Sequence, residues 1–189
     1  MKVEIKILNK ELYNNLDYVD AKTLEPIVDY YALPKYATER SAGIDLICPK
    51  DIILYPGERL DIHTGLAIWI GSKDYYNGSY TRYSDDYPLA RVGGFVFPRS
   101  GLGKKGLILA NTVGVIDEDY QGELIVSAWN NNTISIRDSI GYGIDIKLKK
   151  GQRFAQLVFM PVIEVQWDVV EEFSDKTGRG EGRHGSTGE

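Results

Sequence analysis

Hydrophobic and polar residues alternate over many short stretches of the chain, which is the pattern of half-buried β-strands. Near the N-terminus, Val3, Ile5 and Ile7 alternate with charged residues. Further strands are expected over residues 44–47, 51–54, 59–62, 65–70, 94–97, 106–110, 133–136 and 144–148, and a long apolar strand over residues 154–165, interrupted at Pro161. Many short strands without a strong long helix predict an all-β sandwich or barrel.

The most informative stretch is residues 111–129, NTVGVIDEDYQGELIVSAW. Two β-branched runs flank a polar turn over residues 117–122, which predicts a β-hairpin. The turn offers carboxylates, the ring of Tyr120 and backbone groups not used in a ladder, all suited to a pocket for a flat polar ring. Taken alone, the same pattern is also that of an ordinary hairpin with a solvated acidic turn.

Several polar segments interrupt or follow the strands. We expect one β domain over residues 1–173, in which Val169 and Val170 end the packed part, with surface insertions at about 14–31, 71–94 and 131–144. A short helix is predicted within residues 20–31. Residues 174–189 are rich in glycine and hold almost nothing apolar to bury, so we expect a mobile arm. An ordinary disordered terminus and a phosphate-wrapping segment both have this composition.

Composition and charge narrow the function. The chain has 189 residues, of which 43% are apolar and 26% charged, as in a single soluble domain. A net charge of −5 argues against direct nucleic-acid binding but permits a small anionic substrate. Cys48 is the only cysteine, which fits a reducing compartment, the cytoplasm or nucleus. The sequence shows no signal peptide and no run of ~20 apolar residues that could span a membrane. We therefore expect neither secretion nor membrane association.

Three short motifs carry candidate chemistry. In FPRSGLGKKG, a predicted strand leads into Arg99, Ser100, Gly101 and Gly103, a guanidinium, a hydroxyl and glycine N–H groups that suit a phosphate cradle. Gln156 lies in an apolar run, so it is expected to make a hydrogen bond, either to the backbone or to a ligand.

Asp45 lies in a predicted strand, where aspartate is disfavoured, and would either cap a turn or organise the water shell of a metal. No zinc or nucleophile constellation is present in the sequence, and His63 is interpreted as a strand residue.

Taken together, the motifs resemble the trimeric dUTP diphosphatase (dUTPase) family. Five segments match in the family's order: AGIDL at 42–46, PRSGLG at 98–103, NTVGVIDEDYQGEL at 111–124, GQRFAQL at 151–157 and RGEGRHGSTG at 179–188. The resemblance implies a jelly-roll-like β fold and a homotrimer with active sites shared between subunits. It also implies Mg²⁺-assisted hydrolysis of dUTP to dUMP and pyrophosphate by water attack at the α-phosphate, which keeps uracil out of DNA and supplies dUMP for thymidylate synthesis.

The resemblance also implies roles for individual residues. Asp117 would orient and deprotonate the attacking water, while Asp45 would act on the metal's water shell and the triphosphate would supply the direct metal ligands. The triphosphate would be held by Arg99, Ser100, Gly101 and Gln156. Uracil would be read by the side chain of Asn111 and by backbone groups of Gly114, Val115, Ile116 and Ile125, with Tyr120 against the deoxyribose. The arm would close through Arg179, His184, Gly185, Ser186 and Thr187.

Two features depart from the family pattern. In the usual fifth motif, RGxGGFGSTG, glycine and phenylalanine stand where this chain has Arg183 and His184, although histidine can still stack on a base. The insertions are interpreted as surface decoration or as the site of a protein partner. Two alternatives to dUTP hydrolysis stay open. One is a dCTP deaminase, because deaminases of that kind share the fold. The other is a regulatory module whose insertions contact a partner.

Overall fold

The computed structural model describes residues 3–14, 32–71, 90–132 and 144–180. In chain order the elements are β1 (Glu4–Ile7), α1 (Lys10–Tyr13), β2 (Ile44–Ile47), β3 (Ile52–Leu54), β4 (Arg59–Trp69), β5 (Ala90–Pro98), α3 (Ser100–Gly103), β6 (Leu107–Leu109), β7 (Gly114–Ile116), β8 (Glu123–Asn130), β9 (Ile146–Leu148) and β10 (Arg153–Ile163). The helix expected within 20–31, the strand expected at 133–136 and most of the three expected insertions lie outside the described residues.

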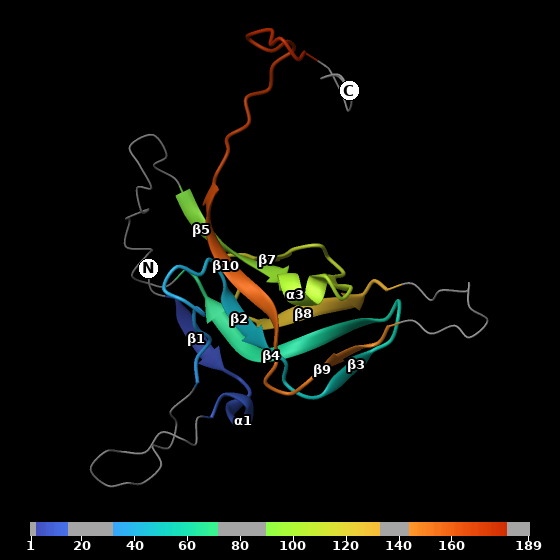
Figure 1. Cartoon of the computed structure of the whole chain (residues 1–189). Coiled ribbons are helices and arrows are strands. Elements are labelled where there is room, and N and C mark those ends of the chain that lie inside the picture. The colour runs from blue at the N-terminus through green and yellow to red at the C-terminus, as the bar shows by residue number, and fades with distance from the viewer. Residues whose placement is uncertain (1–2, 15–31, 72–89, 133–143, 181–189) are drawn as a thin grey trace, which may run out of the picture.

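Two four-stranded sheets and a two-stranded ribbon form the body (Figure 1). One sheet has the order β1-β4-β8-β6, the other the order β2-β10-β5-β7, and β3 pairs with β9. The fold is therefore all-β, as the alternation of apolar residues predicts. Both described helices, α1 and α3, are four-residue turns, and neither has the length or hydrophobicity needed to cross a membrane.

The hydrophobic core is made by the facing sides of the sheets and the ribbon. Every second residue of β8 is buried, and the same alternation occurs in β3 and β9. The largest fully buried side chains include Tyr13, Leu46, Ile62, Leu124 and Phe154. Since burial of one such side chain contributes about 1.5–3 kcal/mol, this core supplies the main force that holds the sheets together.

The strand predictions were accurate where local alternation decides the structure. The strand expected at 44–47 has those bounds in β2. The two strands expected at 59–62 and 65–70 are instead one strand, β4. They are joined by a bulge, since the pairing with β8 shifts register between His63 and Ala67, and Gly65 has φ +73°.

Two other expectations need correction. β5 begins at Ala90, so residues 90–94 belong to a strand and not to the expected insertion at 71–94. Pro161 does not interrupt β10, because β2 pairs with β10 only as far as Leu157. Beyond that point β5 is the neighbour of β10 in the described sheet, and a proline, which has no N–H to donate, is tolerated on the open side.

The predicted hairpin around residues 117–122 is wrong. Its two strands, β7 and β8, belong to different sheets: β7 pairs with β5, whereas β8 pairs with β4 and β6. The polar turn between them is therefore a crossover from one sheet to the other.

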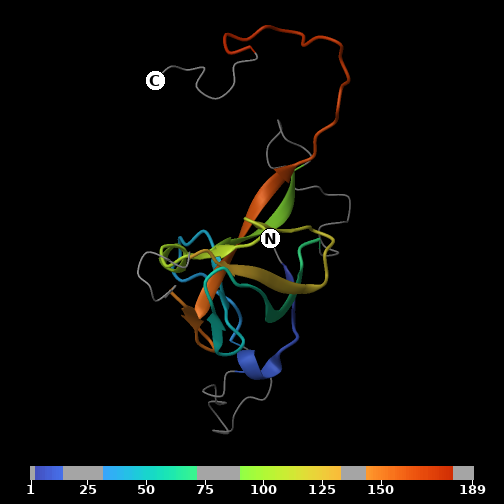
Figure 2. The same ribbon diagram turned by 90° about the vertical axis from the view of Figure 1, so that its right-hand side faces the viewer.

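The chain leaves the body after β10. Residues 164–170 run away from the two sheets as an extended segment, and residues 171–180 bend at its far end (Figures 1 and 2). Trp167 is 89% exposed and Val169 94% exposed in the isolated chain. Val169 and Val170 therefore do not end the packed part; in this chain it ends near Ile163, before the expected boundary at residue 173.

Asn130 ties the ribbon to the first sheet and is completely buried. Its Nδ2 donates to the carbonyl oxygens of Leu54 and Ile144, each at 2.9 Å, and its Oδ1 accepts from the N–H of Asn132 at 3.1 Å. One amide side chain thus satisfies three backbone groups around the C-terminal end of β8.

Replacing this amide with an apolar group is expected to be costly. We predict that Asn130→Leu lowers the free energy of unfolding by about 3 kcal/mol, because buried backbone groups lose their partners. Asn132→Ala is the matched control: its Nδ2 contacts are exposed, so the loss should be under about 1 kcal/mol. Urea unfolding at one fixed protein concentration measures both; equal losses would contradict the assignment.

Candidate active site

Asp117 stands at the start of the crossover turn. It directly follows β7, and its side chain is exposed. The turn is held by two backbone hydrogen bonds, from Tyr120 N to Asp117 O at 3.2 Å and from Gly71 N to Glu118 O at 2.9 Å. The carboxylate is thus presented to solvent from a backbone fixed on both sides.

Glu123 anchors the other end of the turn to the bulge of β4. One carboxylate oxygen accepts from Gly65 N at 2.8 Å, and the other lies 2.8 Å from His63 Nδ1. Tyr120 Oη donates to Glu123 O at 2.9 Å. Gly122 is required by this arrangement, because a Cβ there would collide with the Tyr120 ring. His63 is a strand residue, as predicted from the sequence.

The residues predicted to read uracil lie along β7 and just before it. β7 is the edge strand of its sheet in the described part of the chain, so its outer backbone groups are not paired with another strand there. Asn111 and Val115 are exposed. Thr112 has φ +68°, a region that β-branched residues rarely adopt, and such strain is typical of ligand-binding segments. Ile125, on β8, is 44% exposed.

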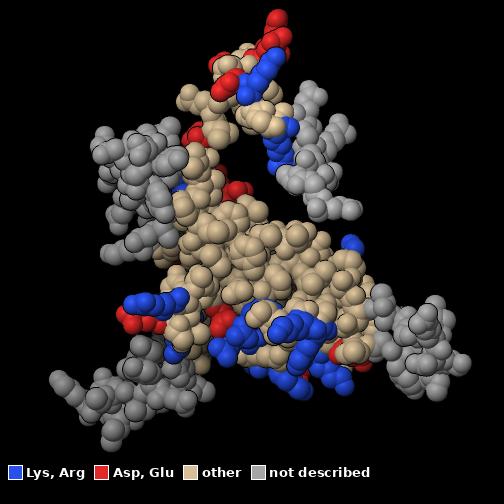
Figure 3. All heavy atoms as spheres, turned by 45° about the horizontal axis from the view of Figure 1, so that its top comes forward, with Lys and Arg blue, Asp and Glu red and all other residues tan. Residues whose placement is uncertain are grey.

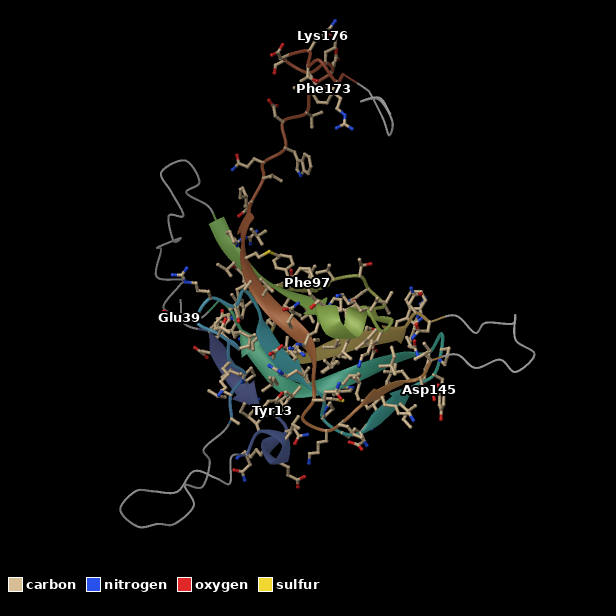
Figure 4. The ribbon with its side chains drawn as sticks, viewed as in Figure 1. Tyr13, Glu39, Phe97, Asp145, Phe173 and Lys176 are labelled. Carbon is tan, nitrogen blue, oxygen red and sulfur yellow. The ribbon has the colours of Figure 1, made fainter. Side chains whose placement is uncertain are left out.

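The predicted phosphate cradle lies where β5 ends and α3 begins. Arg99 is the residue between them, and Ser100 and Gly101 are exposed. Gly103 does not fit the prediction that both glycines face a ligand, because its N–H donates to Arg99 O at 2.8 Å. Phe97, near the end of β5, lies beside this turn in the body, well away from Phe173 and Lys176 on the arm (Figure 4).

Gln156 joins the first, second and fourth motifs. Its Nε2 donates to Pro98 O at 3.1 Å. Its Oε1 lies over Gly43, where a Cβ would come within 2.8 Å. The backbone hydrogen bond is the structural role that the sequence left open for Gln156, and it places the amide next to the cradle.

Asp45 receives two arginines. Arg99 Nε lies 2.7 Å from one carboxylate oxygen, and Arg153 NH1 lies 3.2 Å from the other. Arg153 was not among the predicted site residues. On a regular strand it would face away from Gln156, but β10 shifts register between Arg153 and Ala155, which breaks the alternation. Its place in GQRFAQL was the only sequence signal.

The predicted site has a nucleoside half, which includes Asp117, and a phosphate half, which includes Arg99. The two halves are far apart in one chain. In the ladder between β5 and β7, Ile116 pairs with Gly94, so Asp117 lies at the level of Gly93. Arg99 follows Pro98 at the other end of β5. Six residues of extended strand separate these levels, roughly 20 Å at ~3.3 Å per residue. Within one chain, the structure brings Arg99 and Gln156 together at the phosphate cradle, but it does not bring Asp117 there.

Two grooves lie near these elements. A groove of about 550 Å³ is lined by Arg91, Phe95, Val115, Ile116, Asp117 and Val162. None of the predicted triphosphate residues lines it. Another, of about 400 Å³, lies between β4 and the segment after β1 and holds no predicted substrate residue.

The remaining predicted positions concern the arm and a metal. Arg179 is exposed, whereas His184, Gly185, Ser186 and Thr187 lie outside the described residues. Within the described ranges, no group of three or more His, Cys, Asp or Glu side chains could hold a metal ion directly.

Comparison with known proteins gives one consistent result. The dUTPase family model matches residues 78–188. The deoxyuridine 5'-triphosphate nucleotidohydrolase of Pseudomonas fluorescens (strain SBW25) is 41% identical over 174 residues, covering 90% of this chain and 97% of the relative. That of Klebsiella pneumoniae (strain 342) is 42% identical over 174 residues, covering 90% and 96%.

Among solved structures, the dUTPase of Staphylococcus bacteriophage 80alpha with dUPNHPP shares the fold. Its TM-score is 0.68 at 22% identity, over 99% of this chain and 98% of that one. The family model covers more than half of the chain, and the relatives match nearly all of it. On this basis, the chain belongs to the dUTPase family.

Proposed function

We propose that the protein is a dUTP diphosphatase that hydrolyses dUTP to dUMP and pyrophosphate. The observation that carries the proposal is the exposed Asp117, held at the end of an edge strand within the segment that the dUTPase family model matches. Asp117 accepts a proton from a water whose oxygen attacks the α-phosphorus. The bond from that phosphorus to the oxygen bridging to the β-phosphate breaks, and pyrophosphate leaves.

The phosphate cradle supplies charge and position for this step. Arg99 and Ser100 contact the triphosphate, with Gly101 allowing close approach of the backbone. Gln156, already directed at the cradle by its bond to Pro98, holds the phosphate chain. Because phosphoryl transfer leaves little covalent work for a protein, positioning and charge stabilisation carry most of the rate.

Uracil recognition is assigned to β7 and the loop before it. Asn111 and the backbone of Gly114, Val115 and Ile116, with that of Ile125 on β8, pair with the polar edge of the base. Cytosine presents a donor where uracil has an acceptor, and a mispaired buried group costs ~1–3 kcal/mol. Tyr120 packs against the deoxyribose and leaves no room for a 2′-hydroxyl.

The separation of the two halves supports an active site shared between subunits of a homotrimer. About 20 Å between Asp117 and Arg99 is too far for both to act on one α-phosphate and its leaving group. We therefore assign the nucleoside half to one subunit and the phosphate half to its neighbour. To the arm, which leaves the body after Ile163, we assign further nucleotide contacts by Arg179, His184, Gly185, Ser186 and Thr187.

Mg²⁺ fits the residues present if the triphosphate supplies its direct ligands. Mg²⁺ sites commonly use substrate phosphates and waters with one or two carboxylates. Asp45 has both oxygens next to arginines, yet each carboxylate oxygen can accept more than one hydrogen bond, including one from metal-bound water. When bound, the metal neutralises charge on the phosphates.

We also propose that the expected insertions bind a protein partner. They lie mostly outside the described residues. Phage dUTPases such as that of bacteriophage 80alpha control transfer of virulence genes. Pull-downs with intact protein and with residues 72–89 deleted test the proposal: equal recovery of a partner, or none from either, would reject it.

The substrate is tested by pyrophosphate release from dUTP, dCTP, dTTP and UTP, with Mg²⁺ and with EDTA. We expect release from dUTP alone, and only with the metal. Ammonia release from dCTP would instead identify a deaminase. Release from no nucleotide would contradict the proposed function and favour the regulatory module.

Asp117→Asn should bind dUTP with near-normal affinity but lower kcat by about 10³-fold or more, since the water loses its proton acceptor. Asp119→Asn is the matched control, because it removes an exposed carboxylate from the same turn. Its kcat should change less than about 3-fold. Near-normal turnover by Asp117→Asn would remove this residue from the mechanism.

Gly122→Ala should relax sugar selection. The added Cβ displaces the Tyr120 ring, so the ratio of kcat/KM for dUTP over UTP should fall about 10-fold. Gln121→Ala, an exposed neighbour in the same turn, should leave the ratio unchanged. If Gly122→Ala keeps the full ratio in a folded protein, Tyr120 does not set the preference.

A further inference from the structure

Several exposed lysines lie on elements that adjoin the phosphate cradle in sequence or by hydrogen bonds, in a protein whose net charge is −5. Lys and Arg side chains gather along the lower front of the body, with few acidic side chains among them (Figure 3). We define the basic rim as the exposed lysines near the ribbon and after α3: Lys50, Lys104, Lys105, Lys147, Lys149 and Lys150. None of these residues belongs to the predicted site.

Hydrogen bonds connect one part of the basic rim to the cradle. The turn that carries Lys149 and Lys150 is fixed to Cys48: Cys48 N donates to Gln152 O, and Gly151 N donates to Cys48 O, each at 2.8 Å. Arg153 follows this turn directly and shares the Asp45 carboxylate with Arg99. Positive charge therefore continues from the turn into the cradle.

The lysines after α3 are connected to the lysines near the ribbon through Asn132. Asn132 Nδ2 donates to Lys105 O at 2.8 Å and to Ile144 O at 3.2 Å, so the lysines after α3 lie beside the start of the β9 segment. In β9, Lys147 is exposed between two buried residues. Its side chain is thus directed to solvent, away from the core.

Nearby carboxylates neutralise only part of this charge. Lys149 Nζ lies 2.7 Å from Asp51, whose other oxygen accepts from Lys150 N at 2.9 Å. The hydrogen bond from Lys149 lowers the pKa of Asp51, which therefore stays ionised and offsets that lysine. Asp45 is occupied by its arginines, and Asp145 lies next to the strand that holds Lys147. No described carboxylate is bonded to the side chain of Lys147 or Lys150.

We propose that the basic rim attracts and steers the triphosphate of dUTP into the cradle. The inference rests on the proposed function, since the ligand is its substrate. A nucleoside triphosphate is strongly anionic, and the net negative charge of the protein would otherwise repel it. A surface of one sign around a site raises association rates by ~10–10³-fold at low salt. These lysines act at long range, so they contribute to capture and not to turnover.

The test compares two variants that change the net charge equally. Lys147→Gln combined with Lys150→Gln removes two charges from the basic rim and keeps the pair between Lys149 and Asp51. Lys6→Glu makes the same net change on β1, at the edge of the other sheet, where Lys6 is exposed. Steady-state hydrolysis of dUTP is measured at ~20 mM and ~500 mM ionic strength, where the Debye length falls from roughly 20 Å to roughly 4 Å.

The expected result is specific to place and salt. At low ionic strength the double variant should lose about 3- to 10-fold in kcat/KM with kcat within about 2-fold, and the loss should vanish at high ionic strength. Lys6→Glu should change kcat/KM by less than about 2-fold at either ionic strength. An unchanged kcat/KM in the double variant, or an equal loss in Lys6→Glu, would overturn steering while dUTP hydrolysis stands. No hydrolysis by the unaltered protein would overturn the proposed function itself.

Discussion

The pairing of β5 with β7 determines the geometry of the site. Its register places Ile116 opposite Gly94 and Gly114 opposite Val96. Both glycines permit close approach, because a Cβ on Gly94 would lie 3.1 Å from Ile116 Cβ, and one on Gly114 would lie 3.1 Å from Val96 Cβ. The pairing leaves Asp117 at one end of β5 and Arg99 at the other. In the described part of the chain it also leaves β7 at the edge of its sheet, with its outer backbone groups unpaired by another strand.

The elements that could be predicted from the sequence are those decided locally. The apolar pattern located β2 and, within the strand expected at 144–148, β9, and the motif residues indicated the turn and the cradle. The predicted hairpin failed because two β-branched runs around a polar turn give the same local signal whether the strands pair or separate into two sheets. The choice of partner depends on distant residues, here Val96 and its neighbours in β5.

Arg153 shows the same limit at the site. Its sequence position places it on the wrong face of a regular strand, and only the register shift in β10 brings it to Asp45. The use of the Gly103 N–H inside α3 was likewise decided by backbone hydrogen bonding and not by residue type. Net charge also conceals a local property: a chain of net charge −5 still holds a run of exposed lysines, Lys147, Lys149 and Lys150, just before Arg153. The sequence was sufficient to predict which chemical groups take part. Which of them lie close together depends on how the strands pack.

The central claim is that one active site combines Asp117 of one subunit with Arg99 of another. Mixing tests it most directly. Asp117→Asn and Arg99→Ala proteins, each expected to have very low activity alone, are unfolded together and refolded as mixed assemblies, with each variant refolded alone as the control. Shared sites predict that the mixture regains a substantial part of wild-type dUTP hydrolysis, since some sites then pair an intact Asp117 with an intact Arg99. If mixed assemblies form and stay as inactive as the separate variants, both residues act within one chain and the account is wrong.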